Sequence, residues 1–417
     1  MRVRIHRGAR QVGGTCVELE SQGRRLLLDL GRPLEAERDE FVPLPRVAGL
    51  LEADPTLLGI VLSHPHQDHW GQIPDVHTSV PVYTGGVAGR ILREAAFFGA
   101  GAYAVATAAE LRHAEPLHIG PFQVTPFAAD HSAADAYSLL VEADHQRLFY
   151  TGDLRAHGRH HGRFDDLIAA PPADIDALLM EGTHVQASGA PTPRGPTEAD
   201  VQAQFENTLA ETKGLVLAAF SAQNIDRLCG VYAACLATGR TLVVDLYAAT
   251  MAAAVGDPGA PLPGSPNYRI WVPQNQRVRI KEAGAFERVN TLGAARIFPE
   301  EMARLGAKAV VLYRDGVAAQ LARMLAPDGA TLVWSMWRGY LDGDRGARTR
   351  QRIRQHHWHV AHHHASGHAS VADLQALVHA LTPRTVVPIH SFAPERYASL
   401  FNNVVVHADG TWWEVGS

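Results

Sequence analysis

Short apolar runs separated by polar turns dominate the first 190 residues and predict a domain rich in β-strands. Residues 2–5 and 16–20 alternate between apolar and polar side chains, as half-buried strands do, and Gly13-Gly14 predicts a turn between them. The run 59–62, Gly-Ile-Val-Leu, is apolar and predicts a buried strand. Further strands are predicted at 24–30, 81–84, 120–127, 136–142, 147–150 and 177–180, and helical spacing predicts a helix at 87–98.

The pattern changes after a stretch rich in Pro and Gly at 191–196, which predicts a linker. Helices are then predicted at 197–213, which opens with a Thr-x-x-Asp capping pattern, and at 223–236. Strands are predicted at 214–220, 241–246, 309–313 and 331–335, and the stretch 251–275 is predicted to be a loop. Such strand–helix–strand units favour a small parallel α/β sheet. A helix at 373–381 and a strand at 385–389 are predicted near the end of the chain.

Composition indicates a folded chain of more than one domain. A length of 417 residues predicts two or three domains, and 46% hydrophobic with 19% charged residues is typical of chains with a sizeable core. Three cysteines without Cys-x-x-Cys spacing do not make a disulfide framework and fit a reducing compartment. The N-terminal residues lack an apolar signal core, and no apolar run is long enough to span a bilayer. We therefore expect a cytoplasmic protein with no membrane partner.

Charge is unevenly distributed along the chain. The formal net charge is −5, but residues 190–355 carry 20 Lys and Arg against 15 Asp and Glu. A basic middle segment beside an acidic remainder favours a polyanionic partner, and bound metal ions would offset part of the acidic charge.

The most informative stretch is 62–71, Leu-Ser-His-Pro-His-Gln-Asp-His-Trp-Gly. It places His64, His66, Asp68 and His69 directly after a predicted strand, where a loop can direct several side chains to one point. Imidazole suits zinc and similar metals, and a carboxylate neutralises part of the metal charge. We therefore predict a metal site here rather than a polar surface loop that happens to be rich in histidine.

Other acidic and histidine residues also follow predicted strands. Asp29 lies at the end of an apolar run, where a carboxylate is costly unless it is paired. It either forms a turn before a glycine or orients a ligand of the metal loop, and we favour the second interpretation. His131 and Asp153 each follow a strand, and the carboxylate of Asp153 is a candidate to bridge two metals. Glu181 follows the next strand along the chain.

A segment rich in histidine lies far downstream. Five of its histidines are expected to be solvated or structural: His356, His357, His359, His362 and His363. His364 and His368 instead flank Ser366 and Gly367, and these small residues would let backbone and hydroxyl approach a phosphate while the imidazoles donate hydrogen bonds. The alternative interpretation is a helix N-terminus capped by a serine.

The order of these residues resembles the metallo-β-lactamase fold, through Asp29, His64-x-His66-x-Asp68-His69, His131 and Asp153. Glu181, His364-Ala-Ser-Gly-His368 and Pro388-Ile-His390 resemble further motifs of its β-CASP branch, the nucleases that include ribonuclease J and the cleavage-and-polyadenylation endonuclease. The resemblance implies an α/β fold: an αββα sandwich formed by residues 1–188 and 356–417, with a parallel-sheet β-CASP domain inserted at 189–355.

The resemblance also implies two metal sites with assigned roles. One ion would be held by His64, His66 and His131, the other by Asp68, His69 and His390, and Asp153 would bridge them. Zinc is expected, with manganese or magnesium as alternatives, because the ligand set contains no thiolate to decide the choice. Asp68 would orient the attacking hydroxide, and His368, assisted by Glu181, would stabilise or protonate the leaving oxygen. His364, Ser366 and His368 would bind the substrate phosphate, and Asp29 would hold the metal loop.

The predicted function is that of a metal-dependent ribonuclease acting on single-stranded RNA in RNA processing, as an endonuclease or a 5′-exonuclease. His390 favours RNA, because DNA-repair members of the branch tend to have Val there. The alternatives are a small-molecule hydrolase of the lactonase or thioesterase type, a DNA-acting nuclease of the branch, and a non-catalytic RNA-binding relative. The long insert, Glu181 and His368 argue against a small substrate, and the complete ligand set argues against a non-catalytic relative.

Three points stay open in the sequence. Ser391 follows His390, where ribonuclease J relatives commonly have Gly. Arg227 is expected at the start of a helix, either contacting the substrate strand or forming a surface salt bridge, and is assigned no role. The oligomeric state is undecided, a homodimer being one possibility.

Overall fold

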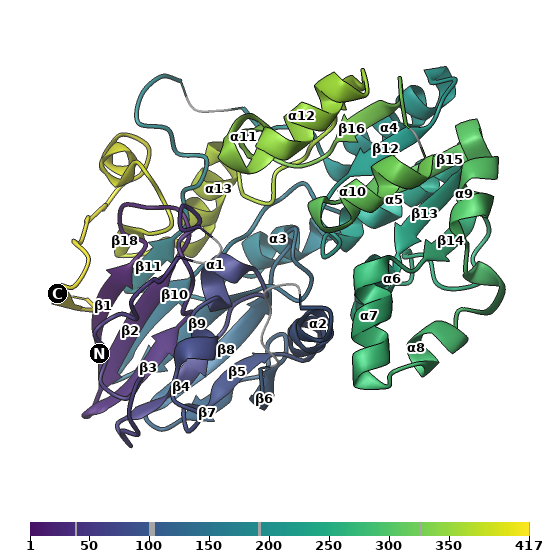
Figure 1. Ribbon diagram of the computed structural model, residues 1–417. Helices are drawn as coiled ribbons and strands as arrows, with labels where there is room; N and C mark the ends of the chain where they lie inside the picture. Colours follow the sequence, from purple (N-terminus) through teal and green to yellow (C-terminus); the bar gives the residue numbers. More distant parts are fainter. Residues whose placement is uncertain (38–39, 100–104, 191–192, 326, 417) are drawn as a thin grey trace. The chain divides into compact units, whose positions relative to one another are not determined.

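The computed structural model describes residues 1–37, 40–99, 105–190, 193–325 and 327–416 (Figure 1). The chain divides into two compact units. The first comprises Met1–Ala96, Gly101–Gly195 and Gly367–Ser417, and the second Phe97–Ala100 and Pro196–Ser366, less the residues outside the description. Residues 191 and 192 of the predicted linker are among those outside it. No described helix is both long and apolar enough to cross a lipid bilayer.

The first unit contains two mixed sheets. One has seven strands in the order β19 (Trp412–Glu414), β1 (Arg2–Arg7), β2 (Cys16–Ser21), β3 (Arg24–Leu28), β4 (Leu57–Val61), β5 (Val82–Gly85) and β6 (Thr107–Leu111). The other has six, in the order β18 (Thr385–Pro388), β11 (Ala177–Met180), β10 (Gln146–Tyr150), β9 (Tyr137–Ala143), β8 (Phe122–Ala128) and β7 (Leu117–Ile119).

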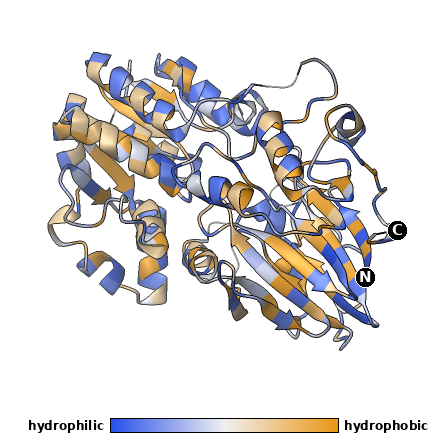
Figure 2. Cartoon of the chain, turned by 180° about the vertical axis from the view of Figure 1, so that it is seen from behind, coloured by the Kyte–Doolittle hydropathy of each residue, from blue (hydrophilic) through white to orange (hydrophobic). Residues whose placement is uncertain are grey.

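Alternation along these strands produces three apolar layers in the first unit. One cluster joins side chains of both sheets, such as Leu26 and Val61 from the first and Val141 and Leu179 from the second. A second cluster joins the six-stranded sheet to the helices α3 (Gly162–Ala169) and α13 (Val371–Leu381). A third covers the seven-stranded sheet with α1 (Gln67–Trp70), α2 (Gly86–Phe97) and the segment around Leu50. The result is the predicted αββα sandwich, and Figure 2 shows its strands mostly in the orange of apolar residues.

Parallel strands explain why the candidate site gathers at one place in this unit. β3 and β4 are parallel neighbours in one sheet, and β10, β11 and β18 are parallel neighbours in the other. The loops that leave their carboxyl ends therefore emerge from the same edge of each sheet. These loops begin at residues 29, 62, 151, 181 and 389, and each contains predicted site residues.

The second unit is a six-stranded parallel sheet covered by helices. Its order is β14 (Tyr268–Trp271), β13 (Thr241–Asp245), β15 (Ala309–Tyr313), β12 (Val216–Ala219), β16 (Thr331–Trp334) and β17 (His359–His362). Its helices are α4 (Glu198–Glu211), α5 (Ile225–Ala237), α6 (Leu246–Val255), α7 (Gln274–Ala283), α8 (Glu287–Asn290), α9 (Pro299–Leu305), α10 (Asp315–Leu325), α11 (Arg338–Asp342) and α12 (Ala347–Gln355). α9, α10 and α11 pack on one face of the sheet through an apolar cluster. The α/β fold with an inserted parallel sheet is therefore confirmed.

Two details of the prediction need correction. The stretch 251–275 is not a loop throughout, because it contains the end of α6 and the strand β14. Burial of Met251, Ala252 and Tyr268 in the sheet's packing decides this, which composition alone does not reveal. The insert also extends beyond residue 355, because β17 pairs in parallel with β16 and so belongs to the inserted sheet.

Candidate metal centre

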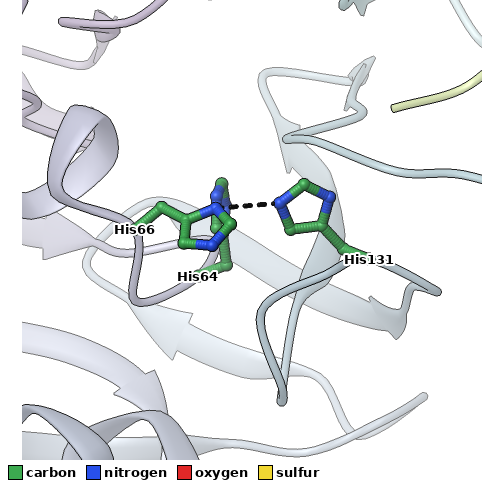
Figure 3. A group of neighbouring side chains, drawn as sticks. All are labelled: His64, His66 and His131. Atoms are coloured by element: carbon green, nitrogen blue, oxygen red, sulfur yellow. Dashed lines mark hydrogen bonds between the residues drawn. The ribbon is translucent and has the colours of Figure 1, made fainter. Parts of the chain in front are cut away.

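The loop after β4 contributes two histidines to a first ligand group. His64 and His66 come from this loop, and His131 comes from the loop after β8. Their candidate ligand nitrogens lie within 4.8 Å of one another, and His131 Nε2 is 3.0 Å from His66 Nδ1. Figure 3 shows the three rings converging, with the dashed line joining His66 and His131. Three imidazoles at this spacing can hold one tetrahedral metal ion and leave a position open.

A second ligand group lies beside the first in the same unit. It consists of Asp68, His69, Asp153 and His390, whose candidate ligand atoms also lie within 4.8 Å of one another. His69 Nε2 is 3.8 Å from Asp68 Oδ2, and His390 Nε2 is 3.8 Å from the same oxygen. Asp153 links the two groups, because its Oδ2 is 3.6 Å from His64 Nε2 and 3.2 Å from His69 Nε2.

The residues fit divalent metal ions because their inward-facing atoms lack partners. Among the described residues, no hydrogen-bond partner exists for the buried Nε2 atoms of His64, His69 and His390, nor for either carboxylate oxygen of Asp153. Buried polar atoms without a partner are rare, and each costs about 1–3 kcal/mol. Metal coordination would satisfy all five atoms. Imidazole and carboxylate donors without thiolate suit zinc as well as manganese.

Asp29 organises the metal loop from the end of β3. Its carboxylate is fully buried and accepts hydrogen bonds from Ser63 N at 2.7 Å, Ser63 Oγ at 2.7 Å and Tyr150 Oη at 2.6 Å. Its Oδ2 also lies 2.7 Å from His69 Nδ1, so this imidazole donates to Asp29 and keeps Nε2 for a metal. Its backbone has φ of 59°, which a short polar residue tolerates better than most.

Sequence reasoning missed the other groups that orient the ligands. Ser63 Oγ contacts His64 Nδ1 at 3.0 Å, and Thr15 Oγ1 contacts His390 Nδ1 at 3.0 Å. His131 Nδ1 donates to Gly367 O at 2.5 Å, which leaves its Nε2 for a metal. Ser63 directly precedes His64, so this partner could have been predicted from the sequence. Thr15 and Gly367 lie far along the chain from the histidines that they contact, and no sequence pattern indicates them.

Burial sets the protonation of the first ligand group. Burial together with the neighbouring imidazoles lowers the pKa of His64 and that of His131 well below the usual value. Both rings are therefore neutral at pH 7, which is the form that binds a metal. Burial raises the pKa of Asp153, but the imidazoles of His390 and His69 outweigh it and lower the pKa well below the usual value. A charged carboxylate thus stands between the two groups.

Glu181 and His368 form a partly buried ion pair next to Asp153. His368 Nδ1 lies 3.1 Å from Glu181 Oε2, 3.1 Å from Thr183 Oγ1 and 3.8 Å from Asp153 Oδ2. Burial lowers the pKa of His368, but Glu181 and Asp153 outweigh it and raise that pKa to about 9. His368 is therefore an imidazolium at neutral pH, held by Glu181.

The other two residues of the predicted phosphate-binding motif, His364 and Ser366, belong to the second unit and are described with it. Burial lowers the pKa of His364 to about 3, so its ring is neutral at pH 7. The helix that follows the motif, α13, begins at Val371 and is capped by Ser370 rather than Ser366.

Arg227 is buried, which contradicts contact with a substrate strand and places its ion pair inside the second unit rather than on the surface. It is 1% exposed and forms a bidentate pair with Glu198, with Nε to Oε2 at 2.9 Å and Nη2 to Oε1 at 3.0 Å. It also donates to Ser335 O at 2.7 Å and to Ala365 O at 3.3 Å. Arg227 thus holds the second unit's segment that leads into the His364–His368 motif.

Comparison with known proteins agrees with this arrangement. Residues 24–203 match the model of the "Beta-lactamase superfamily domain". This segment of the chain is therefore similar to the metallo-β-lactamase superfamily. The chain is also similar to "Ribonuclease J" from two strains of Mycobacterium tuberculosis, CDC 1551 / Oshkosh and ATCC 25618 / H37Rv. Identity to each is 25% over 413 residues, covering 94% of this chain and 68% of the relative. These relatives and the inserted sheet agree with the β-CASP branch.

Two further relatives are more distant. "Ribonuclease J 1" from Streptococcus pyogenes serotype M3 is 23% identical over 250 residues, covering 57% of this chain and 43% of the relative. A crystal structure of a protein of unknown function from Enterococcus faecalis V583 superimposes with a TM-score of 0.79 at 18% identity, covering 99% of both chains. This likeness supports the fold alone. The match to the superfamily model and the two ligand groups together indicate divalent metal ions as cofactors, without identifying the metal.

Proposed function

We propose that the chain is a two-metal phosphodiesterase that cleaves single-stranded RNA. The observation that carries the proposal is the position of Asp153, whose two buried oxygens lack hydrogen-bond partners and lie near imidazoles of both ligand groups. A carboxylate shared by two groups is suited to a pair of metal ions, which clamp the attacking and leaving oxygens in phosphoryl chemistry. A single structural metal would need neither the second group nor an open position.

In this proposal each ligand group holds one ion, zinc in preference to manganese or magnesium, because most donors are imidazoles. The first group is His64, His66 and His131, the second is Asp68, His69 and His390, and Asp153 is shared. Bound ions would supply a hydroxide nucleophile at neutral pH and neutralise charge on the phosphate oxygens. Asp68 would orient the nucleophile by accepting its hydrogen bond, since its side chain is 11% exposed, more than the other side chains of its group.

His368 is proposed to act on the leaving oxygen. As an imidazolium with Nδ1 held by Glu181, it would donate from Nε2 to a phosphate oxygen or protonate the leaving group. Glu181 is a positioning residue, because it touches His368 and the backbone of Leu154 and Ala369. We also propose His364 and Ser366 as phosphate contacts, on the basis of the sequence motif.

The substrate class rests on the relatives and on charge. The curated relatives are named as ribonucleases, and residues 190–355 carry an excess of basic residues. Phosphate contacts supply much of the affinity for single-stranded nucleic acid. A small-molecule hydrolase, a DNA-acting nuclease and a non-catalytic RNA-binding protein are the alternatives. We also propose a cytoplasmic location, which three buried cysteines fit.

The test compares substrates under identical conditions. The purified chain loaded with zinc or manganese is incubated with 5′-labelled single-stranded RNA, with DNA of the same sequence, and with a lactone and a thioester. We expect chelator-sensitive cleavage of RNA. Preferential DNA cleavage, lactone or thioester hydrolysis with intact RNA, or RNA binding without cleavage would each replace the proposal with the corresponding alternative.

A second measurement separates the modes of cleavage. RNAs that carry a 5′-monophosphate, a 5′-triphosphate or a 5′-hydroxyl are digested, and the products are sized. Release of mononucleotides from monophosphorylated RNA alone indicates a 5′-exonuclease, whereas internal fragments from all three indicate an endonuclease.

A further inference from the structure

Helix α12 of the second unit has an unusual charge pattern. Its sequence, Ala-Arg-Thr-Arg-Gln-Arg-Ile-Arg-Gln, contains four arginines and no acidic residue. Arg348 and Arg352 are four residues apart, as are Arg350 and Arg354. Like charges at this spacing lie on one side of a helix and repel each other. The negative end of the helix dipole offsets this only in the last turn, which contains Arg352 and Arg354.

Only two of the four arginines of α12 form hydrogen bonds with described residues of the second unit. Arg350 Nη1 donates to the carbonyls of Leu341 and Gly343, and Arg352 Nη1 donates to Tyr313 Oη at 3.4 Å. Arg348 and Arg354 are exposed and make no hydrogen bond or ion pair with any residue that the structure describes. Two of the four cations thus fix the helix, and two present their charge to solvent.

An exposed aromatic pair precedes α12 along the chain. Trp337 is 62% exposed and Tyr340 is 37% exposed, and their rings meet edge to face with centroids 5.3 Å apart. The Trp337 ring covers Gly339, where an added Cβ would lie 2.3 Å from Cη2. Trp334 Nε1 donates to Trp337 O at 3.3 Å, which fixes the backbone below the ring. A large exposed ring is therefore held in place rather than buried.

We infer that Trp337 and the exposed arginines of α12 form an additional contact for single-stranded RNA, separate from the residues of the metal centre. Arg348 and Arg354 pair with backbone phosphates, and a base stacks on Trp337, the combination that binds single strands without sequence preference. The bond from Arg350 to Leu341 O links α12 to the segment that contains Trp337 and Tyr340, so the helix and the aromatic pair are neighbours in the second unit. This inference rests on the proposed function, because it extends the same substrate.

The composition of this surface favours RNA over other macromolecules. A stable protein interface needs an apolar core, whereas the exposed residues of α12 are Arg, Gln and Ala. A helix lying on a membrane needs an apolar face, and the side of α12 formed by Thr349 and Ile353 is turned into the unit instead. A polyanion with flat rings matches both the charge and the aromatic pair.

The test measures RNA binding with the metal removed by chelator, so that no cleavage occurs. Fluorescence anisotropy compares the wild-type chain with Arg348→Gln/Arg354→Gln on a long RNA of about 30 nucleotides and a short one of about 8. We expect the variant to bind the long RNA about tenfold more weakly at low salt, and its slope of log affinity against log salt to fall by about 1.4, at about 0.7 per phosphate contact. Cleavage of the short RNA with metal restored should not change.

Matched variants distinguish loss of this binding surface from a general effect of removing positive charge. Arg277→Gln/Lys281→Gln on α7 removes the same charge from two exposed residues and should leave long-RNA affinity near the wild-type value. Trp337→Ala should weaken binding about tenfold, and Trp337→Phe should largely restore it, because stacking needs only a ring.

The inference is overturned if the α12 variant binds long RNA like the wild type, which would leave a protein or membrane partner for this surface, or if the α7 control weakens binding equally. It is also overturned if the wild type binds no RNA. Binding that depends on α12 in a chain that cleaves no RNA would overturn the proposed nuclease activity while the binding surface stands.

Discussion

Replacing Asp29 with Asn should weaken metal binding without removing any proposed ligand. The carboxylate of Asp29 receives four hydrogen bonds, three of them at Oδ2, and one of these comes from His69. An amide has one acceptor atom and one donor group, so at least one of the four buried donors loses its partner. His69 also loses the negative charge that increases the basicity of its Nε2.

The expected magnitude follows from that contact. Loss of a carboxylate behind a metal-binding histidine typically reduces metal affinity 10- to 100-fold, or about 1.4–2.7 kcal/mol. The loss should fall mainly on the group formed by Asp68, His69 and His390, because Asp29 contacts His69 directly. RNA cleavage at limiting metal should fall with occupancy and recover as metal is raised.

Competition titration with a chromophoric chelator measures both binding steps. Asp135→Asn is the matched control, since Asp135 also has positive φ, at 64°, and accepts bonds from Val87 N, Ala88 N and Tyr137 Oη. The control should lose stability but not metal affinity. Unchanged metal affinity in Asp29→Asn, or an equal loss in Asp135→Asn, would refute the reasoning.

Three further predictions concern catalysis. Asp68→Ala combined with His69→Ala should abolish RNA cleavage and lower the metal content to about one ion per chain; residual cleavage at the wild-type rate would place the active site elsewhere. His368→Ala should retain both ions by elemental analysis and reduce kcat by about 10²- to 10⁴-fold, the usual contribution of a general acid, and full activity would refute its role. Arg227→Met should lower kcat with metal content unchanged, because Arg227 supports Ala365 O; Arg314→Met, which breaks a different pair with Asp245 in the same unit, should not, and equal losses would indicate general destabilisation.

Local pattern determined most of the first unit's architecture. The apolar runs ending at Val61, Tyr150 and Met180 are strands, and their last residues are buried, as alternation and β-branched content predict. The loop predicted at 251–275 was too long, because a stretch rich in Ala and Gly is compatible with both a loop and a buried helix. Only packing against the sheet decides between the two structures.

The candidate site divides in the same way between sequence and structure. Ligand identity was readable from the sequence, because His64, His66, Asp68 and His69 lie within six residues and their chemistry is local. The convergence of His131, Asp153 and His390 on that loop depends on β8, β10 and β18, which run in the same direction and so end at the same sheet edge.

The orientation of the imidazole rings of His69, His131 and His390 was decided by tertiary structure alone. Which nitrogen of His69, His131 or His390 is available depends on partners 40, 236 and 375 residues away in the sequence. Arg227 shows the same limit, since only the fold pairs it with Glu198. A sequence therefore determines which side chains can bind a metal, whereas long-range hydrogen bonds decide where their donor atoms point, because a tautomer is set by whichever partner the folded chain brings to the other nitrogen.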